Sequence, residues 1–171
     1  MSSHTRSTKS HAASRRTFLK QTTALGAAVA LPSFTMRAAA NKNSVVRMLH
    51  IGVGGIGGMQ RGQLKSHKKV EFAFLCDVDS NPLKNIGRQF PKAKQFTDYR
   101  EVFEKHLNEF DAVIVDTPDH HHAPMMTRAL AAGKHVYGQK PLVHQLDELR
   151  MIREVLAKRP ELYTQMGNQR A

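Results

Sequence analysis

The sequence predicts an α/β fold in which helices cover both faces of a parallel, doubly wound sheet, and three observations lead to this prediction. Short apolar, β-rich runs alternate with helical patterns along most of the chain, as in consecutive strand–helix–strand units. Residues 112–115 are apolar at every position, which is typical of a strand buried on both faces. A glycine-rich turn at 52–57 separates the first predicted strand from the first helix.

The first half of the predicted sheet has three strands, each followed by a helix. The strands are β-rich apolar runs, and the helices follow from start and stop signals. Pro82 lies at the start of the second helix and Pro91 ends it, while Asp98 is expected to cap the third. In chain order these six elements are predicted at residues 45–51, 59–66, 70–76, 81–89, 94–96 and 98–107.

The second half continues the alternation from strand to helix. Pro124 lies in the first turn of the next helix and Gly133 ends it, as helix start and stop preferences require. Pro160 ends the last helix. In chain order, strands and helices are predicted at 112–115, 124–132, 134–137, 146–158 and 162–165.

Length and composition limit the class of protein. A chain of 171 residues with 40% apolar residues fits one domain of ordinary size. The single cysteine, Cys76, excludes an internal disulfide framework and a Cys-rich zinc site, and we expect it to be a buried core thiol. No apolar run approaches the ~20 residues that span a bilayer, so an integral membrane span is not expected.

The net charge of +12 is distributed unevenly along the chain. Residues 1–40 contain six of the 26 basic residues and none of the 14 acidic ones. The run SRRTFLK at 14–20 resembles a twin-arginine export motif, and a modest apolar segment and the small residues 38–40 follow it. We therefore expect residues 1–40 to be an export signal, cleaved after Ala40, that directs the protein to the periplasm. A disordered basic tail followed by a surface helix is the alternative.

The pattern Gly52-x-Gly54-x-x-Gly57 has the context of a dinucleotide fingerprint, because it follows a strand, opens a helix, and precedes Asp77 at the end of the next strand. Gly52 permits the tight turn, Gly54 lets the backbone approach a pyrophosphate, and Gly57 allows close helix–strand packing. The N-terminus of the helix supplies N–H groups for the phosphates. A glycine-rich turn without a nucleotide is the alternative.

Asp77 is expected to decide which cofactor binds. Its carboxylate would accept hydrogen bonds from the adenosine ribose hydroxyls and repel a 2′-phosphate, which favours NAD over NADP. Arg61 and Lys65 lie nearby in the sequence and leave room for NADP. The excess of basic over acidic residues outside residues 1–40 is scattered along the chain, and the aromatic residues form no platform on which bases could stack. Nucleic-acid binding is therefore not expected.

Two further loops bring polar residues to the carboxyl edge of the sheet, where doubly wound sheets bind ligands. The loop at 116–122 contains three consecutive histidines. Adjacent side chains in a loop diverge, so we expect no metal site; one histidine would instead cap the next helix or touch the cofactor. The second loop contains Lys140, which could hold a substrate hydroxyl or aid proton transfer. An exposed loop lysine is the alternative.

Together these motifs resemble the Gfo/Idh/MocA oxidoreductase family. The resemblance includes the glycine fingerprint, the DVD run at 77–79, the DAVIVDTPDHHH run from Asp111 and the AAGKHVYGQKPL run from Ala131, and it extends over residues 45–169. Members of this family have a Rossmann-type domain and move a hydride between NAD(P) and a sugar, inositol or related polyol. Some members carry twin-arginine signals.

The resemblance implies a role for individual residues. Lys140 would be the lysine of the family's Glu-Lys-Pro motif and the catalytic residue, while Gln139 replaces the glutamate and would still hydrogen-bond the ribose without its charge. Thr117, Pro118 and His122 would lie along the nicotinamide half. The full set of expected cofactor-binding residues is Gly52, Gly54, Gly55, Ile56, Gly57, Asp77, Thr117, Pro118, His122, Gln139 and Lys140.

Family members continue into a second, open-sheet α/β domain that covers the nicotinamide, whereas this sequence ends at Ala171. We therefore expect residues 41–171 to be the dinucleotide-binding domain, truncated before the substrate domain, with an uncovered face that favours homo-oligomers or another association. The expected function is the nucleotide-binding portion of a sugar or polyol oxidoreductase. The alternatives are a catalytically silent, exported NAD-binding module or partner-dependent half-enzyme, and a member that uses NAD transiently in glycoside cleavage.

Overall fold

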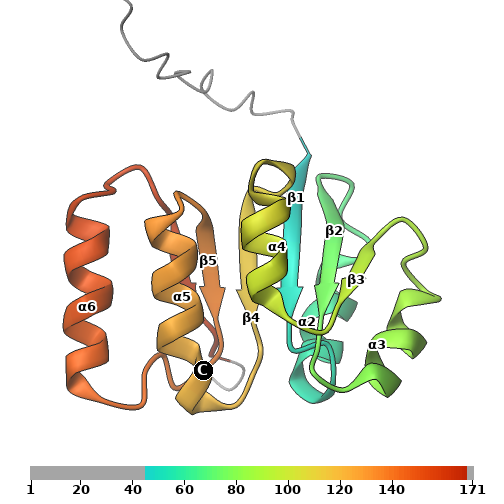
Figure 1. Cartoon of the computed structure of the whole chain (residues 1–171), viewed down its shortest axis with the longest axis horizontal. Helices are drawn as coiled ribbons and strands as arrows, with labels where there is room; N and C mark the ends of the chain where they lie inside the picture. The colour runs from blue at the N-terminus through green and yellow to red at the C-terminus, as the bar shows by residue number, and fades with distance from the viewer. Residues whose placement is uncertain (1–44, 169–171) are drawn as a thin grey trace, which may run out of the picture. The chain divides into compact units, whose positions relative to one another are not determined.

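A computed structural model describes residues 45–168. Within them, one parallel sheet has the strand order β3-β2-β1-β4-β5-β6, and Figure 1 shows β1 and β4 side by side near its middle. The order reverses direction between β1 and β4, as in other doubly wound sheets. This confirms the predicted fold. The strands are β1 (Val46–Ile51), β2 (Val70–Cys76), β3 (Lys94–Phe96), β4 (Ala112–Val115), β5 (His135–Gly138) and β6 (Thr164–Met166).

Helices cover the two faces of the sheet and create a separate apolar core on each. One core packs under α4, α5 and α6, which lie in front of the strands in Figure 1, and the other packs against α2 and α3. Side chains alternate between them along β4, and in β1 Leu49 belongs to the first core and Met48 to the second. The helices are α2 (Gly55–Leu64), α3 (Ser80–Gly87), α4 (Tyr99–Lys105), α5 (His122–Ala131) and α6 (Leu146–Ala157), with short 3₁₀ turns η1 (Leu107–Glu109) and η2 (Asp119–His121).

Several predicted boundaries were wrong, and α2 differs most. It begins at Gly55 instead of Met59 because the glycine turn itself forms the first helical turn, in which the Gly57 N–H donates to the Gly54 carbonyl at 2.9 Å. β6 begins at Thr164 because its register is set by pairing with β5. The predicted cap of α4 is confirmed, since the Asp98 side chain accepts from the Arg100 N–H at 2.9 Å.

The side chains of Lys134 and Cys76 are polar or reactive, and both are buried. Lys134 is 3% exposed, and its ammonium group donates to the carbonyls of Leu107 and Phe110 at 2.6 and 2.8 Å. Cys76 is buried as predicted, and burial raises the pKa of its thiol to about 12. A thiol in this state is a poor nucleophile, so we assign Cys76 to packing.

The expected export signal, its cleavage site after Ala40, and Gln169 of the family's closing motif lie outside the described residues. Across residues 45–168, every helix is too short or too polar to pass through a bilayer.

Candidate functional site

The expected site residues meet at the carboxyl edge of the sheet because three neighbouring strands end in register. Ile51 pairs with Cys76 on one side and with Val115 on the other, so the residues that follow these strands emerge side by side. Gly52 and Asp77 are two of these residues. The strand order reverses direction between β1 and β4, so these residues lie at the topological switch point of the sheet. Ligands of doubly wound sheets bind at such a point.

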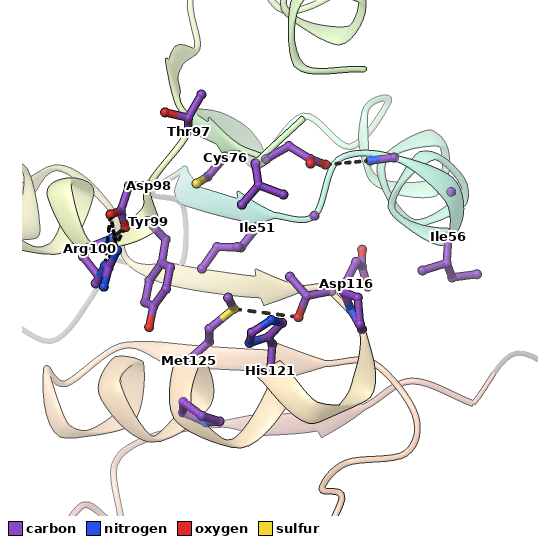
Figure 2. A pocket seen from close by; sticks show the side chains of 18 residues that line it. Ile51, Ile56, Cys76, Thr97, Asp98, Tyr99, Arg100, Asp116, His121 and Met125 are labelled. Atoms are coloured by element: carbon purple, nitrogen blue, oxygen red, sulfur yellow. Dashed lines mark hydrogen bonds and ion pairs between the residues drawn. The ribbon is translucent and has the colours of Figure 1, made fainter. Parts of the chain in front are cut away.

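A cavity of about 740 Å³ opens at this edge, a volume typical of sites for small ligands and cofactors. In Figure 2, Tyr99 and Arg100 lie on one side of it, and His121 and Met125 lie on another. A second cavity of about 350 Å³ shares Ile56 and Thr117 with the first, so the two adjoin. The first contains Gly52, Gly54, Gly55, Ile56, Asp77, Thr117 and Pro118 of the expected set, and the second contains Ile56, Thr117, His122, Gln139 and Lys140.

The glycine turn can take this conformation only without side chains at two positions. Gly52 has a φ of +87°, and a Cβ there would lie 2.5 Å from the Asp116 carbonyl oxygen. A Cβ at Gly57 would overlap the Gly52 carbonyl oxygen and lie 3.0 Å from the His50 ring. Gly57 lines neither cavity; its role is to let α2 approach the end of β1.

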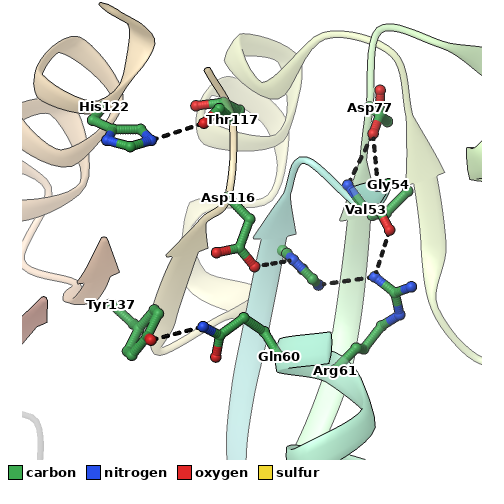
Figure 3. Close-up of polar contacts among 10 residues, drawn as sticks. Val53, Gly54, Gln60, Arg61, Asp77, Asp116, Thr117, His122 and Tyr137 are labelled. Atoms are coloured by element: carbon green, nitrogen blue, oxygen red, sulfur yellow. Dashed lines mark hydrogen bonds and ion pairs between the residues drawn. The ribbon is translucent and has the colours of Figure 1, made fainter. Parts of the chain in front are cut away.

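Asp77 holds this turn in place, a role that the sequence did not reveal. Its Oδ2 accepts from the N–H groups of Val53 and Gly54 at 2.9 and 3.3 Å, and its Oδ1 accepts from the Asp79 N–H at 3.0 Å. Figure 3 shows the first two bonds. A carboxylate offers about four lone pairs, so Oδ1 retains capacity for a ligand hydroxyl at the wall of the cavity.

The opposite wall, at the start of α4, contains an ion pair. The Arg100 guanidinium donates to both carboxylate oxygens of Asp98 at 2.7 to 3.0 Å. These bonds hold the pKa of Asp98 below its usual value and raise that of Arg100. Among the described residues that line this cavity, Arg100 is the one arginine or lysine, and it is already paired with a carboxylate.

His122 ties together the two loops that line the second cavity. The ring is 1% exposed, and its Nδ1 and Nε2 lie 2.7 and 2.8 Å from the carbonyl oxygens of Pro141 and Thr117. Gln139 is also buried, and its side-chain oxygen accepts from the Lys140 N–H at 2.7 Å. The Lys140 side chain itself is exposed at the cavity. Lys140 is thus placed to meet a ligand, while His122 is engaged with the backbone.

A buried polar cluster lies beneath the glycine turn and was missed by sequence reasoning. It consists of His50, Arg61 and Asp116, which are 0%, 3% and 7% exposed. Arg61, which the sequence analysis named with Lys65 as leaving room for NADP, is buried under the turn and does not line the cavity that Asp77 lines. A histidine inside the apolar run 46–51 was the available signal.

We expect the free energy of unfolding to fall as pH decreases from about 7 to about 5, because His50 stays neutral in the folded protein. Burial lowers its pKa below the ordinary 6.5, although the Asp116 and Asp77 carboxylates oppose this and Arg61 reinforces it. Below that ordinary value the unfolded chain binds a proton that the folded chain does not, so stability is lost with acid.

Urea unfolding at the two pH values, with wild type and His50→Gln, measures this contribution. The variant should have a smaller pH dependence than wild type. The exposed His67 supplies the control variant, His67→Gln, which should retain the wild-type slope. Equal slopes in all three proteins would contradict the assignment.

The rings of His120 and His121 lie against each other with centroids 4.1 Å apart and a tilt of 46°, while His122 turns into the protein. Neither caps α5, because that helix has no side-chain cap bond at His121. Within residues 45–168, no group of three or more His, Cys, Asp or Glu side chains is arranged to hold a metal ion.

Residues 46–166 match the GFO_IDH_MocA family, described as an oxidoreductase family with an NAD-binding Rossmann fold. Over 118 residues the chain is 33% identical to a glycosyl hydrolase family 109 protein of Shewanella pealeana and 32% identical to an α-N-acetylgalactosaminidase of Shewanella oneidensis. These matches cover 61% and 64% of this chain and 25% of each relative. The chain therefore spans about a quarter of the length of the curated relatives it matches.

Solved structures share the fold. The myo-inositol 2-dehydrogenase of Lactobacillus plantarum superposes with a TM-score of 0.67 at 25% identity, over 72% of this chain and 36% of that one. The scyllo-inositol dehydrogenase of Lactobacillus casei, solved with NAD(H) and scyllo-inositol, gives the same TM-score and coverage at 22% identity.

Proposed function

Because the chain belongs to the Gfo/Idh/MocA oxidoreductase family, we propose that it binds NAD and serves as the nucleotide-binding portion of an enzyme that oxidises or reduces a sugar or polyol. The observation that carries this proposal is the glycine turn, whose Gly52 lacks room for a Cβ and whose backbone lines the cavity beside Asp77. The cavity volume also fits a cofactor.

The residues of the first cavity would hold the adenosine and phosphate part of the dinucleotide. The N-terminus of α2 presents the Gly55 and Ile56 backbone at the cavity, where its partial positive charge favours a pyrophosphate. Asp77 Oδ1 would accept a ribose hydroxyl. Asp77 and Asp98 both line this cavity, and Arg100 is paired with Asp98, so a 2′-phosphate would meet net negative charge. NAD is the cofactor we propose.

The second cavity would hold the reacting part of the substrate. Bound NAD supplies a hydride acceptor or donor, and the chain supplies Lys140, whose exposed ammonium group would hold a substrate hydroxyl and take part in its proton transfer. Thr117 and Pro118 would line the nicotinamide half together with the loop that His122 fixes. Gln139 would orient Lys140 through the Lys140 N–H.

Calorimetric titration of the full chain with NAD and NADP tests this proposal. We expect NAD to bind at least about tenfold more tightly than NADP, a difference of ~1.4 kcal/mol. Circular dichroism on the same sample verifies that the chain is folded. A folded chain that binds neither nucleotide would contradict the proposal, and preferential binding of NADP would contradict the role of Asp77.

Glycoside cleavage is a second candidate, because the glycosyl hydrolase relatives are 32–33% identical to this chain, against 25% for the myo-inositol 2-dehydrogenase. In that reaction NAD would be reduced and then reoxidised within one turnover. Accumulation of NADH with a panel of polyols supports the dehydrogenase. Release of nitrophenol from a nitrophenyl α-N-acetylgalactosaminide, dependent on NAD and without NADH accumulation, supports the glycosidase. NAD binding with neither activity supports a silent module.

The twin-arginine motif at residues 14–20 supports the further proposal that the protein is exported after folding with its cofactor bound. Association through an uncovered face remains a prediction; Tyr163 and Met166 at β6 and Leu146 at the start of α6 are individually exposed apolar side chains.

A further inference from the structure

The buried cluster of Arg61, His50 and Asp116 connects three elements directly beneath the glycine turn. Arg61 comes from α2, His50 from β1, and Asp116 from the end of β4. Each is at least nine-tenths buried. Buried charged groups are costly unless their partners compensate them. The cluster therefore needs a structural reason, and the proposed cofactor binding and proton transfer do not supply one.

The hydrogen bonds in the cluster have one consistent direction. A guanidinium only donates, so the Arg61 Nη1 at 3.4 Å requires His50 Nδ1 to accept, and His50 Nε2–H then donates to Asp116 Oδ2 at 2.9 Å. The ring is therefore neutral, in agreement with the lowering of its pKa by burial. Arg61 remains charged, so the cluster contains one positive and one negative charge separated by a neutral imidazole.

The free end of this cluster reaches the phosphate-binding turn. Arg61 Nη1 also donates to the Val53 carbonyl oxygen at 2.9 Å. The same peptide group presents the Gly54 N–H, which donates to Asp77 on the opposite side. Figure 3 shows Arg61 and Asp77 reaching this peptide from different directions. Both polar groups of the Val53–Gly54 peptide are thus held by side chains from α2 and the end of β2.

Three other features concern this support for the turn. Gly54 is the N-cap of α2 and has no side chain that could cap the helix. Asp116 Oδ1 has no hydrogen-bond partner within the described residues, so His50 is the polar contact that orients this carboxylate. The absence of a Cβ at Gly57 leaves room for the His50 ring.

We propose that Arg61, oriented by His50 and Asp116, is a positioning residue that fixes the Val53–Gly54 peptide in the conformation that binds the dinucleotide. This inference rests on the proposed function for its ligand. Arg61 acts through the turn and does not touch the cofactor, so its removal should weaken binding of any ligand that carries the pyrophosphate, including ADP-ribose, to the same extent.

The test compares three variants of the full chain by calorimetry with NAD and ADP-ribose. Arg61→Met retains the apolar stem and removes the donors; we expect both affinities to fall at least about tenfold. Arg61→Lys retains a charged donor for the Val53 carbonyl and should recover most of the loss. Lys134→Met removes another buried cation, one that donates to two backbone carbonyls. It should lower the melting temperature while affinity stays within about twofold of wild type.

Affinity that is equal in Arg61→Met and Lys134→Met would overturn the proposal, because loss of a buried cation alone would then explain the effect. Amide hydrogen exchange of Val53 and Gly54 provides a measurement that needs no ligand. We expect faster exchange at both amides in Arg61→Met than in Lys134→Met. Wild type that fails to bind NAD would contradict the proposed function, whereas exchange in Arg61→Met that is no faster than in wild type would contradict the role of Arg61.

Discussion

Gly57→Ala is expected to destabilise the folded chain by about 3 kcal/mol, at the upper end of the cost of overpacking, and to abolish measurable NAD binding. The new methyl group would overlap the Gly52 carbonyl oxygen and press on the His50 ring. The Gly52 side of this contact is backbone, so it cannot turn away as a flexible side chain could. Relief requires α2 to move from β1, which would displace the turn that lines the cavity.

Gly62→Ala on the same helix is the matched control. A Cβ at Gly62 meets nothing within 4 Å, and alanine favours a helix over glycine by about 1 kcal/mol. Urea unfolding should therefore show Gly62→Ala to be at least as stable as wild type, with unchanged NAD affinity. Wild-type stability and affinity in Gly57→Ala would show that α2 does not need to approach β1 this closely.

Asp77→Ala is expected to reduce NAD affinity about 100-fold or more, equivalent to ~2.8 kcal/mol. The carboxylate accepts from the Val53 and Gly54 N–H groups, and hydrogen bonds to a charged group contribute roughly 1.5–3 kcal/mol each. The variant would lose both this support for the turn and the proposed ribose contact. Because the negative charge is also lost, discrimination against NADP should decrease.

The neighbouring Asp79→Ala is the control for this substitution. Asp79 caps α3 by accepting from the Asn81 N–H at 2.8 Å, so its loss should cost about 1 kcal/mol of stability with little change in NAD affinity. Calorimetry and urea unfolding on both variants separate the two effects. A similar loss of affinity in both would mean that charge near the end of β2, and not the position of Asp77, determines binding.

The fold and the site differ in how far local sequence patterns predict them. Each of the six strands lies close to its predicted position. An apolar β-rich run, and the residues that end a neighbouring helix, can be recognised from a few consecutive residues. The start of α2 was predicted less accurately, because the glycine-rich residues were assigned to a turn, whereas residues 55–58 are helical. Propensity is a weak guide at such positions because tertiary contacts override it.

His122 illustrates the limit for a site residue. The sequence places it next to two other histidines in a loop, and its family position suggests a cofactor contact. In the folded chain both ring nitrogens lie against backbone carbonyl oxygens, one of them from Pro141 in the next loop. No spacing within 116–122 indicates that contact, because it forms only when β4 and β5 lie side by side.

The sequence by itself determined the strand–helix alternation, the glycine fingerprint and the position of Asp77 at the end of a strand, because these depend on residues close together along the chain. Only the tertiary structure decided which polar groups meet. Asp77 binds a turn 24 residues earlier, and His50 meets Asp116 across 66 residues. The register of β1 between β2 and β4 determines which residues lie next to each other. Burial then makes an unpaired polar group costly, so the buried polar groups that lie next to each other form hydrogen bonds.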